Sequence, residues 1–366
     1  MNIDKKEILL KHKEFDKMIQ DVYDFKNIWK ENCKQYNIEE QPHILPKADR
    51  VVVIGDIHGD WDLTLKSLRL AKVIDEKNEN KWIGGNTIVV QVGDQIDRCR
   101  YTGIACDKKE ATQDDEGNDW KILQYFTNLH KQAEEHGGAV YSLLGNHELM
   151  NVNGDMRYVS YEGYKEFDNY KDPKGETFED GEKARRWAFK PGNPISNFLA
   201  CTRQVALVIG SNIFAHAGVL PRIAKKYSVK NINELMSLYL WDKLKKKSKY
   251  NDIFKSYDYS PLWNRVFGNL KDGDYKSSNC SNLLVPLKEI YKVGKVYVGH
   301  TPQLKEGIKS VCGDKIWLTD YGASKAFDKF DTKYNRLSES ESERSDSRRV
   351  QVLEIIDDKK FNILKL

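Results

Sequence analysis

The stretch VVVIGDIHGD, Val51 to Asp60, decides the fold of this 366-residue chain. Its first four residues, Val51 to Ile54, are apolar and end at a glycine, which is typical of a buried β-strand. Asp56 and His58 follow and alternate along one short loop, so both side chains can face a single ion. The stretch therefore predicts a buried strand whose carboxyl end carries metal-binding residues.

Four more stretches repeat this arrangement, each following a short apolar run. They are GDQIDR (Gly93 to Arg98), GNHE (Gly145 to Glu148), HAG (His216 to Gly218) and GHT (Gly299 to Thr301). The apolar runs lie at residues 87–92, 139–144, 212–215 and 295–298. Because open α/β proteins usually bind ligands outside the carboxyl ends of their strands, we expect the five loops to converge on one site.

Each stretch taken alone has a simpler explanation, because Gly-Asp is an ordinary turn and a lone histidine is more often a hydrogen-bonded polar residue. The set is different, since four of the eight histidines lie in these loops. These four are His58, His147, His216 and His300, whereas His12, His43, His130 and His136 lack this context and are interpreted as surface residues. Coincidence at five strand ends explains the pattern poorly, so we interpret the loops as a functional site.

The order of the motifs resembles that of the calcineurin-like metallophosphoesterases and, within them, the phosphoprotein phosphatase superfamily. The resemblance covers about Asp49 to Ala323. The further stretches GNHELMNVNGDMRYV, AFKPGNP, SPLWNR and TDYGAS are most similar to the Shewanella-like phosphatase branch. The resemblance implies an α/β fold in which a two-sheet β-sandwich is flanked by helices, and an enzyme that hydrolyses phosphomonoesters.

Residue chemistry and the resemblance together predict a centre for two divalent metal ions. The predicted metal ligands are Asp56, His58, Asp94, Asn146, His216 and His300. Asp94 is placed to bridge the ions, because a carboxylate has two oxygens. The resemblance implies that Asn146, His216 and His300 complete the second ion. Mixed imidazole and carboxylate ligands suit Mn, Fe or Zn better than Ca, without selecting among the three.

Such a centre predicts the reaction. Two ions about 3.5 to 4 Å apart lower the pKa of a shared water, so that a bridging hydroxide attacks phosphorus in line. His147 is the predicted general acid that protonates the leaving oxygen. Asp97 is predicted to orient the imidazole and to stabilise its cation, the alternative being a surface aspartate in a turn.

Fixed positive charge is also needed to hold the phosphate. Arg98 offers a guanidinium fork for two phosphate oxygens and is predicted to act in catalysis and substrate binding. The resemblance adds Asn146 and Arg265, the last residue of SPLWNR, as phosphate contacts. Arg157 is a weaker candidate, because a charged residue after a turn is usually only solvated.

Two positions depart from the family pattern, since Cys99 and Ala217 stand where glycine is usual. A thiol beside Arg98 suggests redox-sensitive activity, although most such cysteines are inert packing residues. The six cysteines are irregularly spaced without a CxxC pair, which favours a reducing compartment. The charged amino terminus lacks an apolar signal region, so we expect a cytoplasmic protein without membrane attachment.

The net charge of +4, from 59 basic against 55 acidic residues, is too balanced to indicate nucleic-acid binding. The expected partner is a phosphorylated protein or peptide substrate, and no obligate partner is evident. Two alternatives remain open. One is a small-molecule phosphoesterase such as a dinucleoside polyphosphate hydrolase, which shares the GDxHG and GNHE loops. The other is an inactive scaffold that binds phosphorylated partners, against which the intact ligand set argues.

The domain organisation follows from composition. Residues 1–47 predict an N-terminal helical extension, and residues 48–366 a catalytic domain. Insertions at about 151–199 and 231–291 are expected to border the metal site and to set substrate choice. Residues 336–349 are charged and of low complexity, which predicts a disordered loop, and the two alternating runs after it predict a β-hairpin.

Overall fold

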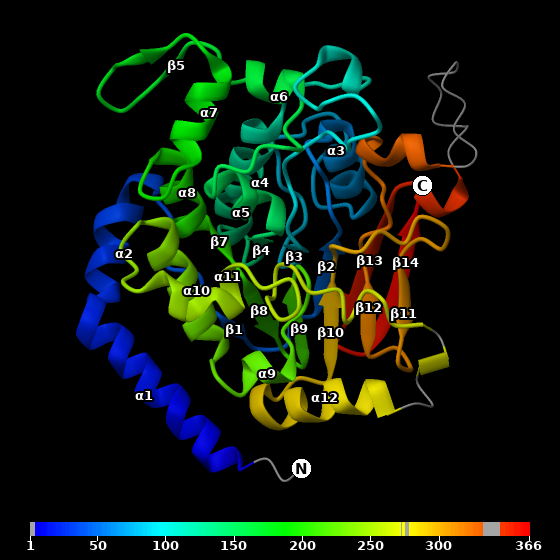
Figure 1. Ribbon diagram of the computed structural model, residues 1–366. Helices are drawn as coiled ribbons and strands as arrows, with labels where there is room; N and C mark the ends of the chain where they lie inside the picture. Colours follow the sequence, from blue (N-terminus) through cyan, green and yellow to red (C-terminus); the bar gives the residue numbers. More distant parts are fainter. Residues whose placement is uncertain (1–3, 272, 275–277, 332–344) are drawn as a thin grey trace.

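A computed structural model describes residues 4–271, 273–274, 278–331 and 345–366. Two six-stranded sheets pack between layers of helices (Figure 1). This architecture is the helix-flanked two-sheet sandwich that the sequence predicts.

The first sheet contains the strands of the first three motifs. Its order is β14-β13-β2-β3-β4-β7. The bounds are β2 Arg50–Ile54, β3 Ile88–Gln91, β4 Ala139–Leu143, β7 Arg203–Gln204, β13 Gln351–Ile356 and β14 Lys360–Lys365. β2, β3, β4 and β7 run parallel, so their carboxyl ends share one edge. The predicted C-terminal hairpin is confirmed as β13 and β14, which pair antiparallel.

The second sheet contains the strands of the last two motifs. Its order is β1-β8-β9-β10-β12-β11. The bounds are β1 Ile44–Leu45, β8 Ala206–Ile209, β9 Asn212–Ala215, β10 Lys295–Val298, β11 Lys309–Val311 and β12 Ile316–Leu318. β9 and β10 run parallel to each other. The five motif loops therefore come from two sheets, rather than from the single sheet edge that the strand pattern alone suggested.

Alternation along β2 explains the layering. Successive residues of a strand point to opposite faces of a sheet. Val51 and Val53 belong to the core between the two sheets, with Phe214 and Tyr297 from the second sheet. Val52 lies on the other face, in the core that the first sheet shares with helices. Because both faces of β2 are buried, its sequence is uniformly apolar.

Helices cover both outer faces of the sandwich. α3 Trp61–Leu70 and α4 Asp119–Glu134 cover the first sheet. α8 Pro194–Thr202, α10 Val229–Leu240 and α12 Ser278–Tyr291 pack in the core of the second sheet. The remaining short elements are α5 Asn146–Val152, α6 Tyr161–Lys165, α7 Gly181–Phe189, α9 Pro221–Ala224, α11 Asn251–Phe254, β5 Tyr170–Lys171 and β6 Thr177–Phe178.

The amino-terminal segment is helical, as expected. α1 Lys5–Tyr23 lies along α10 and α12, and α2 Phe25–Cys33 lies against α8 (Figure 1). Ile19 and Phe25 are buried in the core of the second sheet. The two helices are therefore packed parts of the helical layer, and the boundary at residue 47 stays a prediction.

The cysteines overturn one expectation. All six form disulfides, which join Cys33 to Cys201, Cys99 to Cys106 and Cys280 to Cys312. The prediction of reduced thiols is therefore wrong, and Cys99 is not a free thiol beside Arg98. Irregular spacing concealed the pairs, because the fold brings together residues as far as 168 positions apart. The argument for a cytoplasmic location loses its support, since structural disulfides belong to oxidising compartments.

Two histidines interpreted as surface residues are buried. His12 is 5% exposed and its Nε2 lies 3.0 Å from the carbonyl oxygen of Ala224. His130 is 3% exposed and its Nδ1 accepts the backbone N–H of Val140 at 3.2 Å. An amphipathic helix can bury a histidine when a backbone group forms a hydrogen bond with its imidazole ring.

Residues 336–344, which make up most of the predicted disordered loop at 336–349, lie outside the described residues. Its described end differs from the prediction, because Arg348 is buried and forms ion pairs with Asp328 at 2.8 Å and Asp331 at 3.0 Å. Over the described parts of the chain, no helix has the length and apolar character needed to cross a membrane.

Candidate active site

The loops that follow β2, β3, β4, β9 and β10 meet at one cavity. Its volume is about 480 Å³. Its lining includes His58, Asp94, Asn146, His147 and His300. The structure thus brings the motifs of both sheets together, with the fully buried His216 beneath them.

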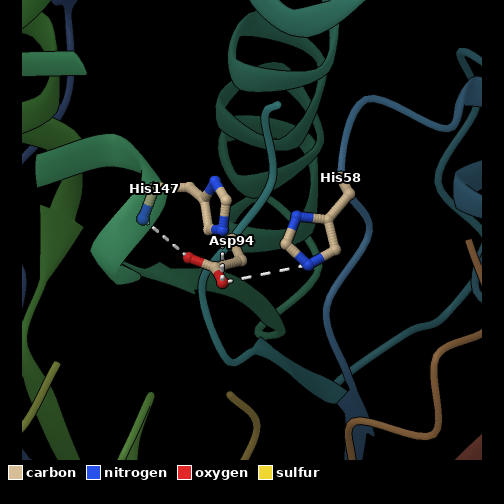
Figure 2. A group of neighbouring side chains, drawn as sticks. All are labelled: His58, Asp94 and His147. Atoms are coloured by element: carbon tan, nitrogen blue, oxygen red, sulfur yellow. Dashed lines mark hydrogen bonds and ion pairs between the residues drawn. The ribbon is translucent and has the colours of Figure 1, made fainter. Parts of the chain in front are cut away.

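Asp94 lies at the centre of the cluster. Its Oδ2 is 3.2 Å from Nε2 of His216 and 3.9 Å from Nε2 of His58. Figure 2 shows His58 and His147 on either side of this carboxylate, and Nε2 of His147 is also 3.9 Å from Oδ2. Two groups with metal-ligand spacing share Asp94, one with His58 and His147 and the other with His216 and His300. A bridging position for Asp94 fits this geometry.

Backbone carbonyls set the tautomers of the three histidines that the sequence predicts as metal ligands. Nδ1 of His58 donates to Ile96 O at 3.2 Å and Nδ1 of His216 donates to Val92 O at 3.0 Å. In His300 the roles are exchanged, and Nε2 donates to the carbonyl oxygen of Trp263 at 3.0 Å. Each ring therefore keeps one nitrogen with a lone pair for a metal ion, which is the usual support of a histidine ligand.

The buried carboxylates of the cavity show whether the site suits metal ions. Oδ1 of Asp56 and Oδ2 of Asp320 are buried and have no hydrogen-bond partner among the described residues. Burial raises the pKa of Asp56 well above its ordinary value, and the neighbouring Asp320 and Asp94 raise it further. Burial likewise raises the pKa of Asp320 to about 6. A bound cation would compensate this cluster of buried negative charge, so the donor set fits divalent ions.

Asp320 was not predicted from the sequence. It follows β12, lies in TDYGAS and lines the cavity. Its position directly after a strand could have indicated a site residue. The five motifs, however, end at Thr301 and do not include it.

Hydrogen bonds from backbone N–H groups to the Glu148 carboxylate hold the Asp94 loop in a strained backbone conformation. Asp94 has a φ of 52°, a left-handed conformation that non-glycine residues seldom adopt. The carboxylate of Glu148 accepts the N–H groups of Asp94 at 3.1 Å, Gln95 at 2.7 Å and Gly145 at 2.7 Å. The Glu of GNHE is thus no metal ligand but a support for the loop that carries Asp94, a role that the motif alone did not reveal.

His147 and Asp97 form the predicted pair. Nδ1 of His147 donates to Oδ2 of Asp97 at 2.8 Å. Asp97 is fully buried, which excludes the alternative that it is a surface residue in a turn. Asn151 donates to Asp97 at 2.9 Å, and Arg185 of α7 lies 3.3 Å from it. Arg185 also pairs with Asp119 at 2.8 Å, so the pair rests on a buried polar network.

The sequence did not identify Asn151, Arg185 or Asp119 as part of this network. Asn151 lies one helical turn after His147, which was a usable indication. Arg185 comes from the insertion at 151–199, and nothing in its local sequence distinguishes it from a solvated arginine.

The predicted phosphate-binding arginines differ in position. Arg265 lines the cavity, and its Nη1 donates to the carbonyl oxygen of His300 at 2.8 Å. Arg98 does not line the cavity; it is 2% exposed and forms an ion pair with Asp60 at 3.0 Å. Arg157 lies at the rim and pairs with Asp155 at 2.8 Å. Arg100, which no sequence motif singled out, lines the cavity instead.

Both predicted insertions contribute to the walls. Tyr158 of the first insertion and Tyr257 and Trp263 of the second line the cavity. A second hollow of about 770 Å³ adjoins it and shares Arg157 and Tyr158 with it. The insertions therefore border the site, as expected.

Comparison with known proteins agrees with this geometry. Residues 49–304 match the calcineurin-like phosphoesterase family. The chain belongs to that family. Members use a dinuclear divalent metal centre, and the histidine and aspartate groups around Asp94 fit one.

Three relatives are similar over about two thirds of the chain or more, and two of them carry more specific names. This calcineurin-like phosphoesterase is 32% identical over 310 residues to Shewanella-like protein phosphatase 2 of Arabidopsis thaliana, covering 76% of the chain and 72% of the plant protein. It is 40% identical over 261 residues to the uncharacterized protein R398 of Acanthamoeba polyphaga mimivirus, covering 66% of the chain and 97% of that protein. Shewanella-like protein phosphatase 1 of Plasmodium berghei is 30% identical over 279 residues, which cover 75% of the chain and 67% of that protein.

Solved structures agree on the fold. A cold-active protein-tyrosine phosphatase of a psychrophilic Shewanella species superposes with a TM-score of 0.56 at 19% identity, covering 89% of the chain and 83% of that structure. A mutant of a cold-active protein tyrosine phosphatase gives a TM-score of 0.61 with the same identity and coverage. The predicted family, sandwich fold and activity class are confirmed, and the calcineurin-like phosphoesterase is a metal-dependent phosphatase.

Proposed function

We propose that this phosphatase removes phosphate from phosphorylated proteins, using His147 as the general acid. The observation that carries the proposal is the buried His147–Asp97 pair, which stands beside the shared carboxylate of Asp94 in an open cavity. Two relatives named as protein phosphatases support a protein substrate. The adjoining hollow supports it as well, because it shares Arg157 and Tyr158 with the cavity and so offers contact surface to a substrate larger than phosphate.

The proposed metal ligands divide into two sets. Asp56, His58 and Asp94 would hold one ion, and Asp94, Asn146, His216 and His300 would hold the other. When bound, a pair of divalent ions lowers the pKa of water and polarises a phosphate. Mn, Fe and Zn all suit these donors. The support is the set of free ring nitrogens and the unpartnered Asp56 Oδ1.

The chain's own residues perform the remaining work. Nε2 of His147 faces the cavity and donates a proton to the leaving oxygen, while Asp97 holds Nδ1 at 2.8 Å and stabilises the imidazolium. Asn146 and Arg265 are the proposed phosphate contacts among the predicted residues. Arg98 is committed to Asp60, so we do not place it on the substrate.

A panel of substrates tests this function. The protein is loaded separately with Mn, Fe and Zn and assayed on phosphoserine, phosphothreonine and phosphotyrosine peptides, on para-nitrophenyl phosphate and on a dinucleoside tetraphosphate. We expect phosphopeptides to be hydrolysed. Inert phosphopeptides with an active nucleotide would establish the small-molecule alternative. No hydrolysis of any substrate, together with an unchanged His147→Ala variant, would establish the scaffold.

We also propose an oxidising compartment for the folded protein, in place of the cytoplasm expected from the sequence. The three disulfides support this location, because glutathione keeps cytosolic thiols reduced. Alkylation of the protein from its source cells without reductant, followed by mass determination, tests it. Six alkylated cysteines would contradict the proposal.

A further inference from the structure

We propose that Arg100, rather than Arg98, binds the substrate phosphate in this protein. The inference rests on the proposed metal site and gives the phosphate contact to a residue outside the family motif. GDQIDR ends at Arg98, and the chain then continues with Cys99 where the family has glycine. The two arginines are two residues apart but have different surroundings.

Arg98 forms a buried ion pair with Asp60 that stabilises the start of α3. Asp60 caps the amino terminus of α3, where its Oδ1 accepts the N–H of Leu63 at 3.0 Å. Its Oδ2 accepts the N–H of Lys325 at 2.8 Å and lies 3.0 Å from Nη1 of Arg98. The carboxylate and the guanidinium are both almost fully buried. Moving Arg98 toward the cavity would leave the buried carboxylate of Asp60 with two backbone N–H donors but without its paired guanidinium, which is destabilising.

Arg100 is directed into the cavity. Its Nη1 donates to the carbonyl oxygens of Asp97 at 3.1 Å and Cys99 at 2.8 Å, which fixes the plane of the guanidinium. The planar group lies against two rings, 5.4 Å from the centroid of Tyr158 and 4.7 Å from that of Phe327. Aromatic faces hold a guanidinium without neutralising it.

No carboxylate forms an ion pair with Arg100 within the described parts of the chain, unlike Arg98 and Arg185. Its Nη2 lies 2.7 Å from Nε2 of His58, a proposed metal ligand. One lone pair cannot serve a guanidinium and a metal ion together. With an ion on His58, Nη2 needs another acceptor, and an anionic phosphate oxygen in this cavity is a strong one.

The chain anchors Arg100 from both sides. Cys99 donates its N–H to the carbonyl oxygen of Tyr158 at 3.1 Å. The Cys99–Cys106 disulfide closes the loop directly after it. Glycine in the family position would offer neither the cross-link nor its stiffness. The cysteine at position 99, in place of the family's glycine, therefore explains the position of Arg100. The disulfide fixes the loop so that the guanidinium faces the cavity.

Three single substitutions test the proposal, each removing one positive charge. They are Arg100→Met, Arg98→Met and Lys108→Met, the last an exposed residue of the same loop. The Mn-loaded proteins are titrated with inorganic phosphate by calorimetry, and their Mn content and melting temperature are measured. Arg100→Lys keeps the positive charge but loses the planar guanidinium. It replaces Arg100→Met in the test if that variant fails to fold.

We expect Arg100→Met to raise the Kd for phosphate about 10- to 100-fold, the size of lost hydrogen bonds to a charged group. Mn content and melting temperature should stay at the wild-type values. Arg100→Lys should give an intermediate Kd. Arg98→Met should lower the melting temperature and leave the Kd unchanged, and Lys108→Met should change neither.

Three results would overturn the proposal. One is wild-type phosphate affinity in Arg100→Met. Another is a weakened Kd in Arg98→Met at an unchanged melting temperature. The third is loss of Mn from Arg100→Met, which would place Arg100 in metal retention instead. Because calorimetry does not need turnover, an inactive wild-type protein that binds phosphate would contradict the proposed function and leave this test intact.

Discussion

The cavity has two walls that are built differently. The strand-end wall consists of the loops after β2, β3, β4, β9 and β10, and it carries the proposed metal ligands and His147. The loop wall consists of residues 99–118 together with α6 and α7. Its Arg100 lines the cavity, whereas its Tyr101, Cys106, Tyr164 and Arg186 line the adjoining hollow. Parallel strands and backbone hydrogen bonds hold the first wall. The second is held by the Cys99–Cys106 disulfide, by α7 residues such as Phe189 that pack in the core, and by the ion pair of Arg185 with Asp119.

The two walls also differ in exposure. The residues before the first wall, such as Val52 and Val89, are fully buried, whereas Tyr101 on the loop wall is 64% exposed. Groups that perform chemistry need fixed positions, while groups that contact varied substrates tolerate adjustment. The comparison therefore predicts that substitutions on the strand-end wall alter kcat. Substitutions on the loop wall should alter the affinity for substrate.

Removing the proposed acid should have the largest effect. His147→Gln should lower kcat on a phosphopeptide about 10²- to 10⁴-fold, because the leaving oxygen departs without a proton donor. Mn content should be unchanged, as measured by atomic absorption. His136→Gln, at an exposed position in the turn after α4, is the control. Loss of metal from His147→Gln would mean that His147 is a ligand, and the comparison would need revision.

Acid should weaken the scaffold of the strand-end wall through His130, which joins α4 to β4. Burial lowers the pKa of His130 to about 4, with nearby Arg203 adding to the effect. A lowered pKa in the folded state gives stability that is present above pH 6.5 and is lost as the pH falls toward 4. The loss is at most about 3 kcal/mol.

His130→Gln should remove this pH dependence, because glutamine can accept the N–H of Val140 without titrating. Urea unfolding at pH 7 and pH 4.5 measures the difference between wild type and variant. An equal loss of stability in both proteins would show that His130 is not the group responsible.

Breaking the loop disulfide should mainly affect substrate binding. In the double variant Cys99→Ser with Cys106→Ser, we expect the free energy of unfolding to fall by about 2 kcal/mol, since the closed loop is short. The KM for a phosphopeptide should rise several-fold while kcat stays within about threefold, because metal ligands and His147 lie on the other wall.

The pair Cys280→Ser with Cys312→Ser is the matched control, because this disulfide lies away from the cavity lining. Its removal should lower stability without changing KM. If kcat fell 100-fold in the Cys99 variant, the two walls would not be separable.

The smallest effect is expected at the loop tip. Tyr101→Ala removes an exposed ring that lines the hollow beside the cavity. The KM for a phosphopeptide should rise about three- to fivefold, the size of one aromatic contact, while hydrolysis of para-nitrophenyl phosphate stays at wild-type rates. Equal changes for both substrates would argue against a peptide contact there.

The strand-end wall was largely predictable from the sequence. A buried strand, a glycine and a polar residue are local features, so five short stretches sufficed to indicate the residues around Asp94, and the family resemblance that they carry implied the sandwich. The pairing of His147 with Asp97 also follows from motif order. These residues are close in space because the carboxyl ends of strands from both sheets meet beside one cavity.

The loop wall was not predictable, because its contacts join distant residues. Arg98 and Arg100 differ little as sequence, and only the buried Asp60 decides which of them turns away from the cavity. Arg185 reaches Asp97 across 88 positions. Cysteine spacing gave the wrong redox state, since pairing depends on which surfaces of α2 and α8 meet.

The Cys33–Cys201 bond has a consequence for proteolysis. It encloses Asp56, His58, Asp94 and Asn146 within one covalent ring of chain, and the loop at 99–118 lies inside that ring. A protease that cuts this exposed loop would open the ring without releasing a fragment. Cut and intact protein should migrate together on a gel without reductant and separate only after reduction, so a single nick can leave the whole ligand set on one connected molecule.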